Sequence, residues 1–351
     1  MVSETATDRL GRRIATQGPI PVHDYVDEAL YGPAGFYTTG GRAGRRGDFL
    51  TAPEVGPLFG AVVARAVDAW WRDEGGPPTF TVLEWGAGPG TLARAVIAAN
   101  PDVLASGALR WFLVERATAQ HEHHPVHDRF TSVVPADAPN VETGLILANE
   151  LLDNLAFDIV ERVDEGWAEI RIDVSATGFV ERRGPLVAPT GLVADDVPVG
   201  TRLPWQRPAR EWLGDALDRV GRGRVVVFDY GGSTADLAGR DGGWLRTHAA
   251  HAGGGDWLTR PGSCDITTDV DLDQLQLHHR ADRHERQDGW LRRFGIDDLV
   301  EEGRATWARS AGVGDLAALT ARSRLREAEA LTDPEGMGGF HVLEWTVGRA
   351  P

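Results

Sequence analysis

A short apolar run followed by a glycine-rich turn and a helical pattern is the feature that most limits how this chain can fold. Residues 80–83 (Phe-Thr-Val-Leu) suit a parallel strand that is buried on both faces. Residues 84–90 (Glu-Trp-Gly-Ala-Gly-Pro-Gly) form the turn, and 91–99 have a helical pattern that Asn100-Pro101 ends. Glycine permits positive φ angles and lets a ligand approach the backbone closely. The unit therefore predicts a strand–turn–helix with a ligand at the turn, although a glycine loop alone is also compatible with a purely structural turn.

Three further apolar runs end in polar or acidic residues. They are 111–114, ending at Glu115, 145–148, ending at Asn149-Glu150, and 224–228, ending at Asp229. In a doubly wound α/β sheet the ligand lies at the carboxyl ends of the strands. The pattern predicts a Rossmann-like α/β fold with its site at this edge, and residues 340–347 read as a closing strand.

The rest of the chain divides by its hydrophobic pattern. We expect an N-terminal helical lid segment at 1–75, a Rossmann-like core at 76–156 and 206–351, and a β-rich insertion at 157–205. Within the first segment, 19–31 read as a short helix. A second helix has an apolar stripe from Val55 to Trp71, and Thr51 and Glu54 fit a capping box at its start. Residues 232–290 are rich in glycine and polar residues and read as a long, partly ordered loop region.

Composition excludes several classes of function. The formal net charge of −16 argues against binding to a nucleic-acid backbone, and no apolar run is long enough to cross a membrane. The only cysteine, Cys264, cannot form an internal disulfide. The cluster His121, His123 and His124 lacks a defined ligand spacing, so we expect no metal site. The N-terminal stretch does not resemble a signal peptide, and with the arginine-only, glycine- and alanine-rich composition it suggests a bacterial cytoplasmic protein.

Acidic residues around the turn indicate the kind of ligand. The spacing G-x-G-x-G departs from the G-x-G-x-x-G of nicotinamide enzymes, which disfavours an oxidoreductase. Glu84, directly before the turn, suits a cationic group such as the amino group of a methionyl moiety. Glu115 is placed to accept hydrogen bonds from a ribose diol, unless it is only a solvated strand end. Asn149 and Glu150 would lie beside the ligand, and Asn149 could also cap a following helix.

Several segments, in order along nearly the whole chain, resemble the MidA-like methyltransferases, the family that includes a mitochondrial arginine methyltransferase acting on a complex I subunit. The resembling segments are 30–37, 47–54, 58–60, 84–92, 113–116, 148–153 and 229–231, with weaker similarity at 246–248, 265–271 and 337–340. The resemblance implies a methyltransferase fold that uses S-adenosylmethionine as methyl donor.

The resemblance also implies a set of donor-binding residues. A lid from 47–54 would place Asp48, Phe49 and Pro53 against the donor, although Asp48 could instead close an Asx turn and Glu54 could serve only the capping box. The full set expected at the donor is Asp48, Phe49, Pro53, Glu84, Gly86, Ala87, Gly88, Gly90, Glu115, Asn149 and Glu150. The chain departs from the family pattern at Trp85, at Leu155-Ala156 and over 197–211.

The acceptor implied by the resemblance is an arginine side chain of a protein, with a respiratory-complex subunit as one candidate. A cationic guanidinium needs carboxylates to orient it and to take up its proton. Glu150, Asp153 and Asp229 are the candidates for catalysis, with Glu150 first. A methyltransferase acting on a small metabolite and a non-catalytic assembly factor that keeps the fold are the alternatives.

Overall fold

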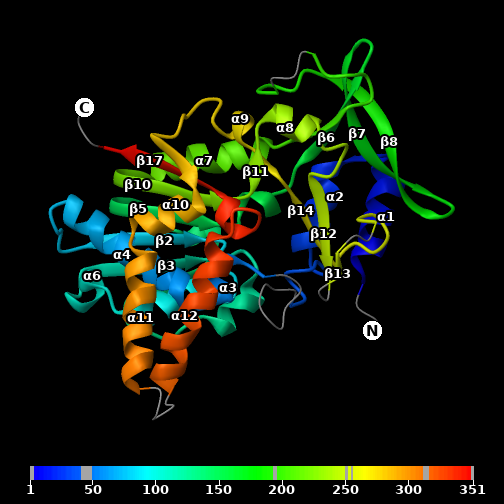
Figure 1. The fold of residues 1–351 in the computed structure, drawn as a ribbon. Coiled ribbons are helices and arrows are strands. Elements are labelled where there is room, and N and C mark those ends of the chain that lie inside the picture. Colours follow the sequence, from blue (N-terminus) through cyan, green and yellow to red (C-terminus); the bar gives the residue numbers. More distant parts are fainter. Residues whose placement is uncertain are drawn as a thin grey trace.

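The computed structural model describes residues 4–40, 50–192, 196–249, 252–253, 256–310 and 316–348. A seven-stranded sheet in the order β16-β17-β10-β5-β2-β3-β4 forms its centre (Figure 1). The strands from β10 to β4 run parallel, while β17 runs antiparallel to both of its neighbours, β10 and β16. The strands of this sheet are β2 (Phe80–Trp85), β3 (Leu109–Val114), β4 (Phe130–Val133), β5 (Val141–Asn149), β10 (Val220–Asp229), β16 (Arg283–Arg286) and β17 (His341–Val347).

Both faces of the central sheet are buried, as the uninterrupted apolar runs of its parallel strands require. Along β5, Leu145 and Leu147 pack in the hydrophobic core on one face, whereas Ile146 and Ala148 pack in the core on the other. This period of two is the consequence of side chains alternating across a strand. The predicted Rossmann-like α/β fold is confirmed, including the four predicted core strands and the closing strand.

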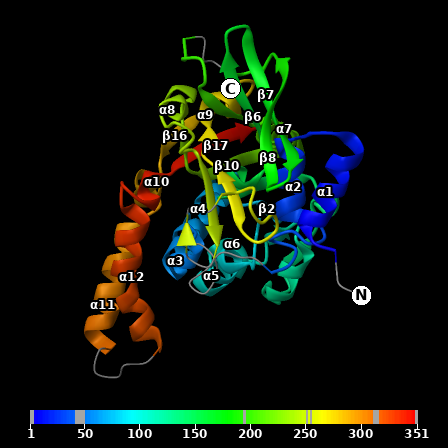
Figure 2. The ribbon, with the colours of Figure 1, turned by 90° about the vertical axis from the view of Figure 1, so that its right-hand side faces the viewer.

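Different helices cover the two faces. One face packs against α4, α5, α6 and α10–α12, and the other against α7 and α9. Figures 1 and 2 show α11 and α12 extending away from the sheet as a hairpin. These helices are α4 (Pro57–Asp73), α5 (Thr91–Ala99), α6 (Asp102–Ala105), α7 (Arg207–Arg219), α9 (Leu272–Leu275), α10 (Gln287–Arg293), α11 (Ile296–Ser310) and α12 (Leu316–Thr332). No helix among the described residues is both long and apolar enough to cross a bilayer.

The start of the second predicted helix differs from the expectation. The chain forms a short helix, α3 (Ala52–Val55), and α4 begins separately after Gly56. The capping box predicted from Thr51 and Glu54 is absent, because the Thr51 side chain makes no capping bond. The start of α4 is instead capped from α12, where the buried Glu327 carboxylate accepts a 2.9 Å hydrogen bond from the Leu58 amide. An acceptor supplied 269 residues away cannot be recognised from a local motif.

A second, antiparallel sheet lies beside the central one, with the N-terminal helices packed on it (Figure 1). Its strands are β1 (Ile20–Pro21), β6 (Asp158–Val163), β7 (Gly166–Ser175), β8 (Gly178–Val187) and β9 (Arg202–Trp205). The helices are α1 (Ala6–Gln17), which the sequence did not reveal, and α2 (Val22–Tyr31), which matches the helix expected at 19–31. Segment 1–75 is thus divided: α1 and α2 pack on the small sheet, whereas α4 packs on the central sheet.

The region 232–290 is more ordered than we expected. Between Gly232 and Trp290 the structure describes two small sheets and several short helices, and only residues 250–251 and 254–255 lie outside the description. The smaller elements of the chain are β11 (Gly231–Gly232), α8 (Thr234–Ala238), β12 (Leu245–Ala249), β13 (Ala252–Gly253), β14 (Asp265–Thr268), β15 (Val270–Asp271) and the 3₁₀ turns η1 (Thr118–His123), η2 (Pro135–Asp137), η3 (Leu152–Asn154) and η4 (Met337–Gly339).

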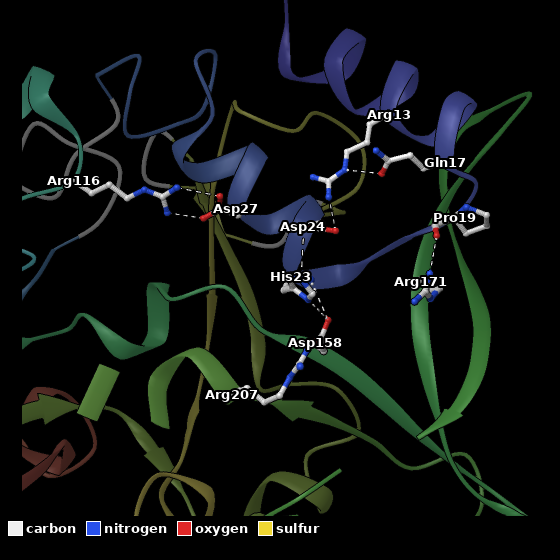
Figure 3. A network of polar contacts seen from close by, with 10 residues as sticks. All are labelled: Arg13, Gln17, Pro19, His23, Asp24, Asp27, Arg116, Asp158, Arg171 and Arg207. Carbon is white, nitrogen blue, oxygen red and sulfur yellow. Dashed lines mark hydrogen bonds and ion pairs between the residues drawn. The ribbon is translucent and has the colours of Figure 1, made fainter. Parts of the chain in front are cut away.

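One buried carboxylate joins the small sheet to helices on either side of it. Asp158, at the start of β6, has no exposed surface. Its Oδ1 lies 2.8 Å from Nδ1 of His23 at the start of α2, and its Oδ2 accepts a 2.7 Å bond from Arg207 at the start of α7 (Figure 3). These contacts lower the pKa of Asp158 despite its burial, which alone would raise it. The network fixes α2, whose last residue, Tyr31, reaches the site described below.

We expect Asp158→Asn to lower the free energy of unfolding by ~1–3 kcal/mol, because it leaves the Arg207 guanidinium and the His23 imidazole without their shared buried carboxylate. Urea unfolding at pH 7 measures the change. Asp164→Asn, in the exposed turn that follows β6, is the matched control and should shift stability by less than about 0.5 kcal/mol. Equal stability of the two variants would contradict the assignment of Asp158 as a tertiary link.

Candidate active site

The order of the parallel strands creates a crevice between β2 and β5. The chain moves outward from β2 to β3 and β4, and then crosses back to β5 and β10 on the other side of β2. Trp85, the last residue of β2, pairs with Val114 of β3 and with Ala148 of β5. The residues that follow these three paired positions, Gly86, Glu115 and Asn149, are therefore brought to one place, where α/β sheets bind ligands.

A cavity lies at this crevice and leaves about 840 Å³ free of protein atoms, including its mouth. It contains most of the predicted donor-site residues, although they come from four distant segments. Those that line it are Pro53, Glu84, Gly86, Ala87, Gly88, Glu115, Asn149 and Glu150. Gly90 lies behind the loop with a φ of 75° as the N-cap of α5, and does not line the cavity. Asp48 and Phe49 lie outside the described residues.

The glycine loop is held by hydrogen bonds at Gly88. Its amide donates to Glu115 Oε2 at 3.0 Å, and its carbonyl oxygen lies 2.8 Å from His124 Nε2. Because a carbonyl can only accept, His124 Nε2 carries the proton, which leaves Nδ1 to accept from the Ser132 hydroxyl at 2.7 Å. Burial lowers the pKa of His124, in agreement with this neutral tautomer. The sequence identified His124 only as part of a weak metal motif and missed this supporting role.

Two buried carboxyl groups flank the loop. Glu84 Oε2 accepts a 2.7 Å bond from the indole of Trp111, and burial raises the pKa of Glu84 to about 8. Glu115 Oε1 accepts a 2.7 Å bond from the Ala117 amide, and burial also raises the pKa of Glu115. A cation or several hydrogen-bond donors stabilise the ionised form of a carboxyl group whose pKa burial has raised. This wall therefore suits a ligand that carries both a cationic group and hydrogen-bond donors.

Glu150 connects the strand edge to α3. It adopts a left-handed φ of 50°, which is unusual for a residue with a side chain, and its Oε1 accepts bonds from the Ala52 amide at 2.9 Å and from Asn149 Nδ2 at 3.1 Å. Burial raises its pKa to about 8.

Two capping roles that the sequence suggested are not found. The possibility that Asn149 caps a helix is wrong, because the next turn, η3, has Leu151 at its N-cap position. Glu54, on α3, accepts a hydrogen bond from the Thr91 hydroxyl instead of forming a capping box.

The structure separates the other two predicted catalytic carboxylates. Asp229 is 1% exposed and lines no cavity described here; its oxygens accept from the amides of Leu152 at 2.9 Å and Tyr230 at 3.0 Å, so it holds the loop that carries Glu150. Asp153 accepts from the Tyr230 hydroxyl at 2.6 Å through Oδ2, while its Oδ1 has no hydrogen-bond partner in the described part of the chain. Asp229 is therefore a positioning residue, and Asp153 keeps a free acceptor.

A second, open cavity adjoins the first. It leaves about 1470 Å³ free, including open solvent, and Asp153 lies in its wall. Glu150 and Asn154 line both cavities and so mark the place where they meet.

Two tyrosines of the first cavity were not predicted. Tyr31 ends α2, and the Tyr37 hydroxyl donates to Asn154 Oδ1 at 2.6 Å. The only signal for them was their position in the family-like segment 30–37.

Comparison with known proteins decides the family. Residues 62–289 match a family model described as "Putative S-adenosyl-L-methionine-dependent methyltransferase". The chain belongs to this methyltransferase family. Among curated relatives, the Drosophila melanogaster protein arginine methyltransferase NDUFAF7 homolog, mitochondrial, is 30% identical over 75% of this chain and 67% of its own length. The human protein arginine methyltransferase NDUFAF7, mitochondrial, is 26% identical over 81% of this chain and 72% of its own length.

A solved structure of a similar protein supports the family assignment and contains a bound ligand. A COG1565 superfamily member and likely methyl transferase from Burkholderia thailandensis, bound to S-adenosyl-homocysteine, superposes with a TM-score of 0.84 at 26% identity, over 99% of this chain and 92% of that one. The predicted enzyme class, an S-adenosylmethionine-dependent methyltransferase, is confirmed. The cavity of this methyltransferase fits the donor, because Asn149 Oδ1 is buried without a partner among the described residues. Apart from its chain neighbours, no described residue has an atom within 4 Å of a Cβ built on Gly88.

We expect Gly88→Asp to weaken S-adenosylmethionine binding about 100-fold or more, equivalent to ~2.7 kcal/mol, because the new side chain would project into open space beside Glu115. Isothermal titration calorimetry measures the affinity. Gly75→Asp is the matched control, since Gly75 also has a positive φ of 84° and open space around it but lies outside the cavity. Unchanged binding by a folded Gly88→Asp protein would rule out this loop as the donor site.

We expect Glu84→Gln to change how the stability of the ligand-free protein depends on pH. A carboxyl group with a raised pKa stabilises the folded state fully below its ordinary value of 4.5, and this contribution is lost as pH rises through about 8. Glutamine cannot ionise and still accepts from Trp111, so the variant should gain on the order of 2 kcal/mol over the wild type between pH 5.5 and 8. Urea unfolding at both pH values tests this; parallel pH profiles would contradict it.

Proposed function

We propose that this methyltransferase transfers its methyl group to the guanidinium of an arginine in a protein. The observation that carries the proposal is the position of Glu150, the carboxylate that lines both the donor cavity and the open cavity beside it. Curated relatives named protein arginine methyltransferases support the same acceptor. The second cavity is open and lined by charged side chains, which favours a protein segment over the closed, aromatic pocket expected for a small metabolite.

The residues of the first cavity would hold the donor through complementary charge and hydrogen bonding. Glu84 faces the cavity with a buried carboxyl suited to the amino group of the methionyl moiety. Glu115 uses one oxygen on the Gly88 amide and the other on Ala117, and each oxygen retains a lone pair for a ribose hydroxyl. Asn149 Oδ1 offers an additional buried acceptor.

When bound, S-adenosylmethionine supplies an electrophilic methyl group whose bond to sulfur breaks with the electron pair remaining on sulfur. The protein's task is to align a guanidinium nitrogen with that methyl and to exclude water. Glu150 at the junction would orient the guanidinium through charge-assisted hydrogen bonds and accept the proton that the nitrogen loses as the new C–N bond forms. Asp153 would hold the other side of the guanidinium with its free Oδ1.

The geometry of Glu150 keeps it ready for this role. Two donors on Oε1 fix the side chain, and both come from segments of the donor cavity, Ala52 of α3 and Asn149 of β5. Burial favours the neutral form of Glu150 until a cation is bound. A guanidinium that binds beside it would therefore lower its pKa and favour the ionised carboxylate. After methyl transfer the same environment accepts a proton readily.

We expect Glu150→Gln to lower kcat on an arginine-containing acceptor by ~10²–10⁴-fold, because glutamine cannot take up the proton. Glutamine can still accept from the Ala52 amide, so donor affinity measured by calorimetry should change by less than about threefold. Glu142→Gln, an exposed residue on the same strand, is the control and should keep full activity.

Retention of full turnover by Glu150→Gln would refute its role as proton acceptor, and binding of the donor without methylation of any arginine would refute the acceptor class. The curated relatives are mitochondrial by name. The bacterial cytoplasmic location inferred from the sequence stays a prediction, as do a respiratory-complex subunit as acceptor and the absence of nucleic-acid partners.

A further inference from the structure

Groups of both charges line the open cavity. The carboxyl groups of Glu150, which also lines the donor cavity, and of the nearby Asp153 mark its inner side. Its outer wall carries the guanidinium groups of Arg240, Arg246 and Arg286, which come from separate elements of the region 232–290. An acceptor arginine bound on the inner side would account for the two carboxyl groups only. The three arginines of the outer wall would repel an acceptor that is positively charged along its whole length.

The acidic groups within the outer wall do not neutralise it. Asp269, which is 1% exposed, is shared by two of the arginines: Arg246 Nη2 lies 2.7 Å from Oδ1, and Arg240 pairs with Oδ2. Glu335 is the other carboxylate on this wall. Arg286 donates to the Gly339 carbonyl and to His341 Nε2, and has no carboxylate partner among the described residues. Among the described residues of this wall, three guanidinium groups thus face two carboxylates, and the Arg286 guanidinium has no anion beside it.

The inner carboxylates and the arginines belong to one continuous wall. The Arg246 guanidinium lies 5.0 Å from the centre of the Tyr230 ring, and the Tyr230 hydroxyl donates to Asp153 Oδ2 at 2.6 Å. The ring therefore holds the inner carboxylate with its hydroxyl and the outer cation with its face. An acceptor that reaches Asp153 would pass along this tyrosine and lie beside Arg246.

From this polarity we infer that the acceptor is an arginine with an aspartate or glutamate close to it in the peptide, the arginine entering between Glu150 and Asp153 and the acidic residue binding the arginine wall at Arg286. The inference rests on the proposed function and names its substrate class. Charge complementarity of this kind sets the choice of partner and the rate of association more than it sets the catalytic step, so KM should respond rather than kcat.

The test uses a pool of synthetic peptides with a fixed central arginine and randomised flanking positions, methylated by the full-length protein and analysed by mass spectrometry. We expect products of the wild type to be enriched about tenfold in aspartate and glutamate near the arginine at low salt, and less at high salt because screening weakens exposed charges. Arg286→Glu should abolish this enrichment or shift it to lysine and arginine, with donor affinity unchanged.

Arg283→Glu is the matched control. Arg283 lies on the same strand, β16, but at odd spacing from Arg286, so its side chain points to the opposite face, and it does not line the cavity. It should keep the wild-type preference. KM and kcat are then measured separately for individual peptides that carry either an acidic residue or its amide counterpart next to the arginine.

The outcomes separate this inference from the function on which it rests. Methylated peptides without acidic enrichment, or the same enrichment in Arg286→Glu, would overturn the inference alone and leave arginine methylation intact. Methylation of free L-arginine but of no peptide would overturn the peptide class, and no methylation of any arginine by donor-bound protein would overturn both the proposed function and this inference.

Discussion

The parallel pairing of β2 with β5 is the constraint on which the rest of the site depends. It is the point where the strand order reverses, so the loops after β2 and β5 leave the sheet in opposite directions and open a crevice between them. The register then brings Gly86, Glu115 and Asn149 together, because Trp85 pairs with Val114 and with Ala148. A shift of one residue in either pairing would turn the buried side chains of a whole strand to the other face, which the two cores on either side of the sheet prevent.

The crevice also concentrates buried acids at the cost of stability. Glu84, Glu150, Asp153 and Asp229 all have raised pKa values, for which burial is the largest cause. The protein limits the cost by hydrogen bonding: backbone amides and the Trp111 and Tyr230 side chains donate to these oxygens. The resulting environment favours cationic ligands, and both the sulfonium donor and the proposed guanidinium acceptor are cationic. The unfavourable burial of acids in the free protein thus becomes part of ligand selection.

The sequence was informative where one segment determines its own structure. The four core strands and the glycine loop follow from local apolar runs and from glycines. Glu84 and Glu115 lie at the cavity, as expected, because strand ends are local features. It failed where the partner is distant. Glu54 contacts Thr91, and Leu58 is capped by Glu327, so the local capping motif was misleading. The helix α1 was missed because its buried apolar stripe is only Ala6, Leu10 and Ile14 in a polar stretch. Asp229 was expected to be catalytic, but only the fold shows that amides occupy its oxygens.

Glu327, which caps α4, lies on the projecting hairpin of α11 and α12. This contact matters for the design of shortened chains for crystallography or protein engineering. In outline the hairpin is an appendage (Figure 2). At its base, however, Glu327 satisfies the Leu58 amide, and the fully buried Leu331 belongs to the same core as α4. Removing the hairpin would leave a helix terminus without its acceptor and a hole in the central core, directly beside α3 of the donor cavity. A shortened chain would therefore lose affinity for the donor together with stability, although none of the described hairpin residues lines the donor cavity.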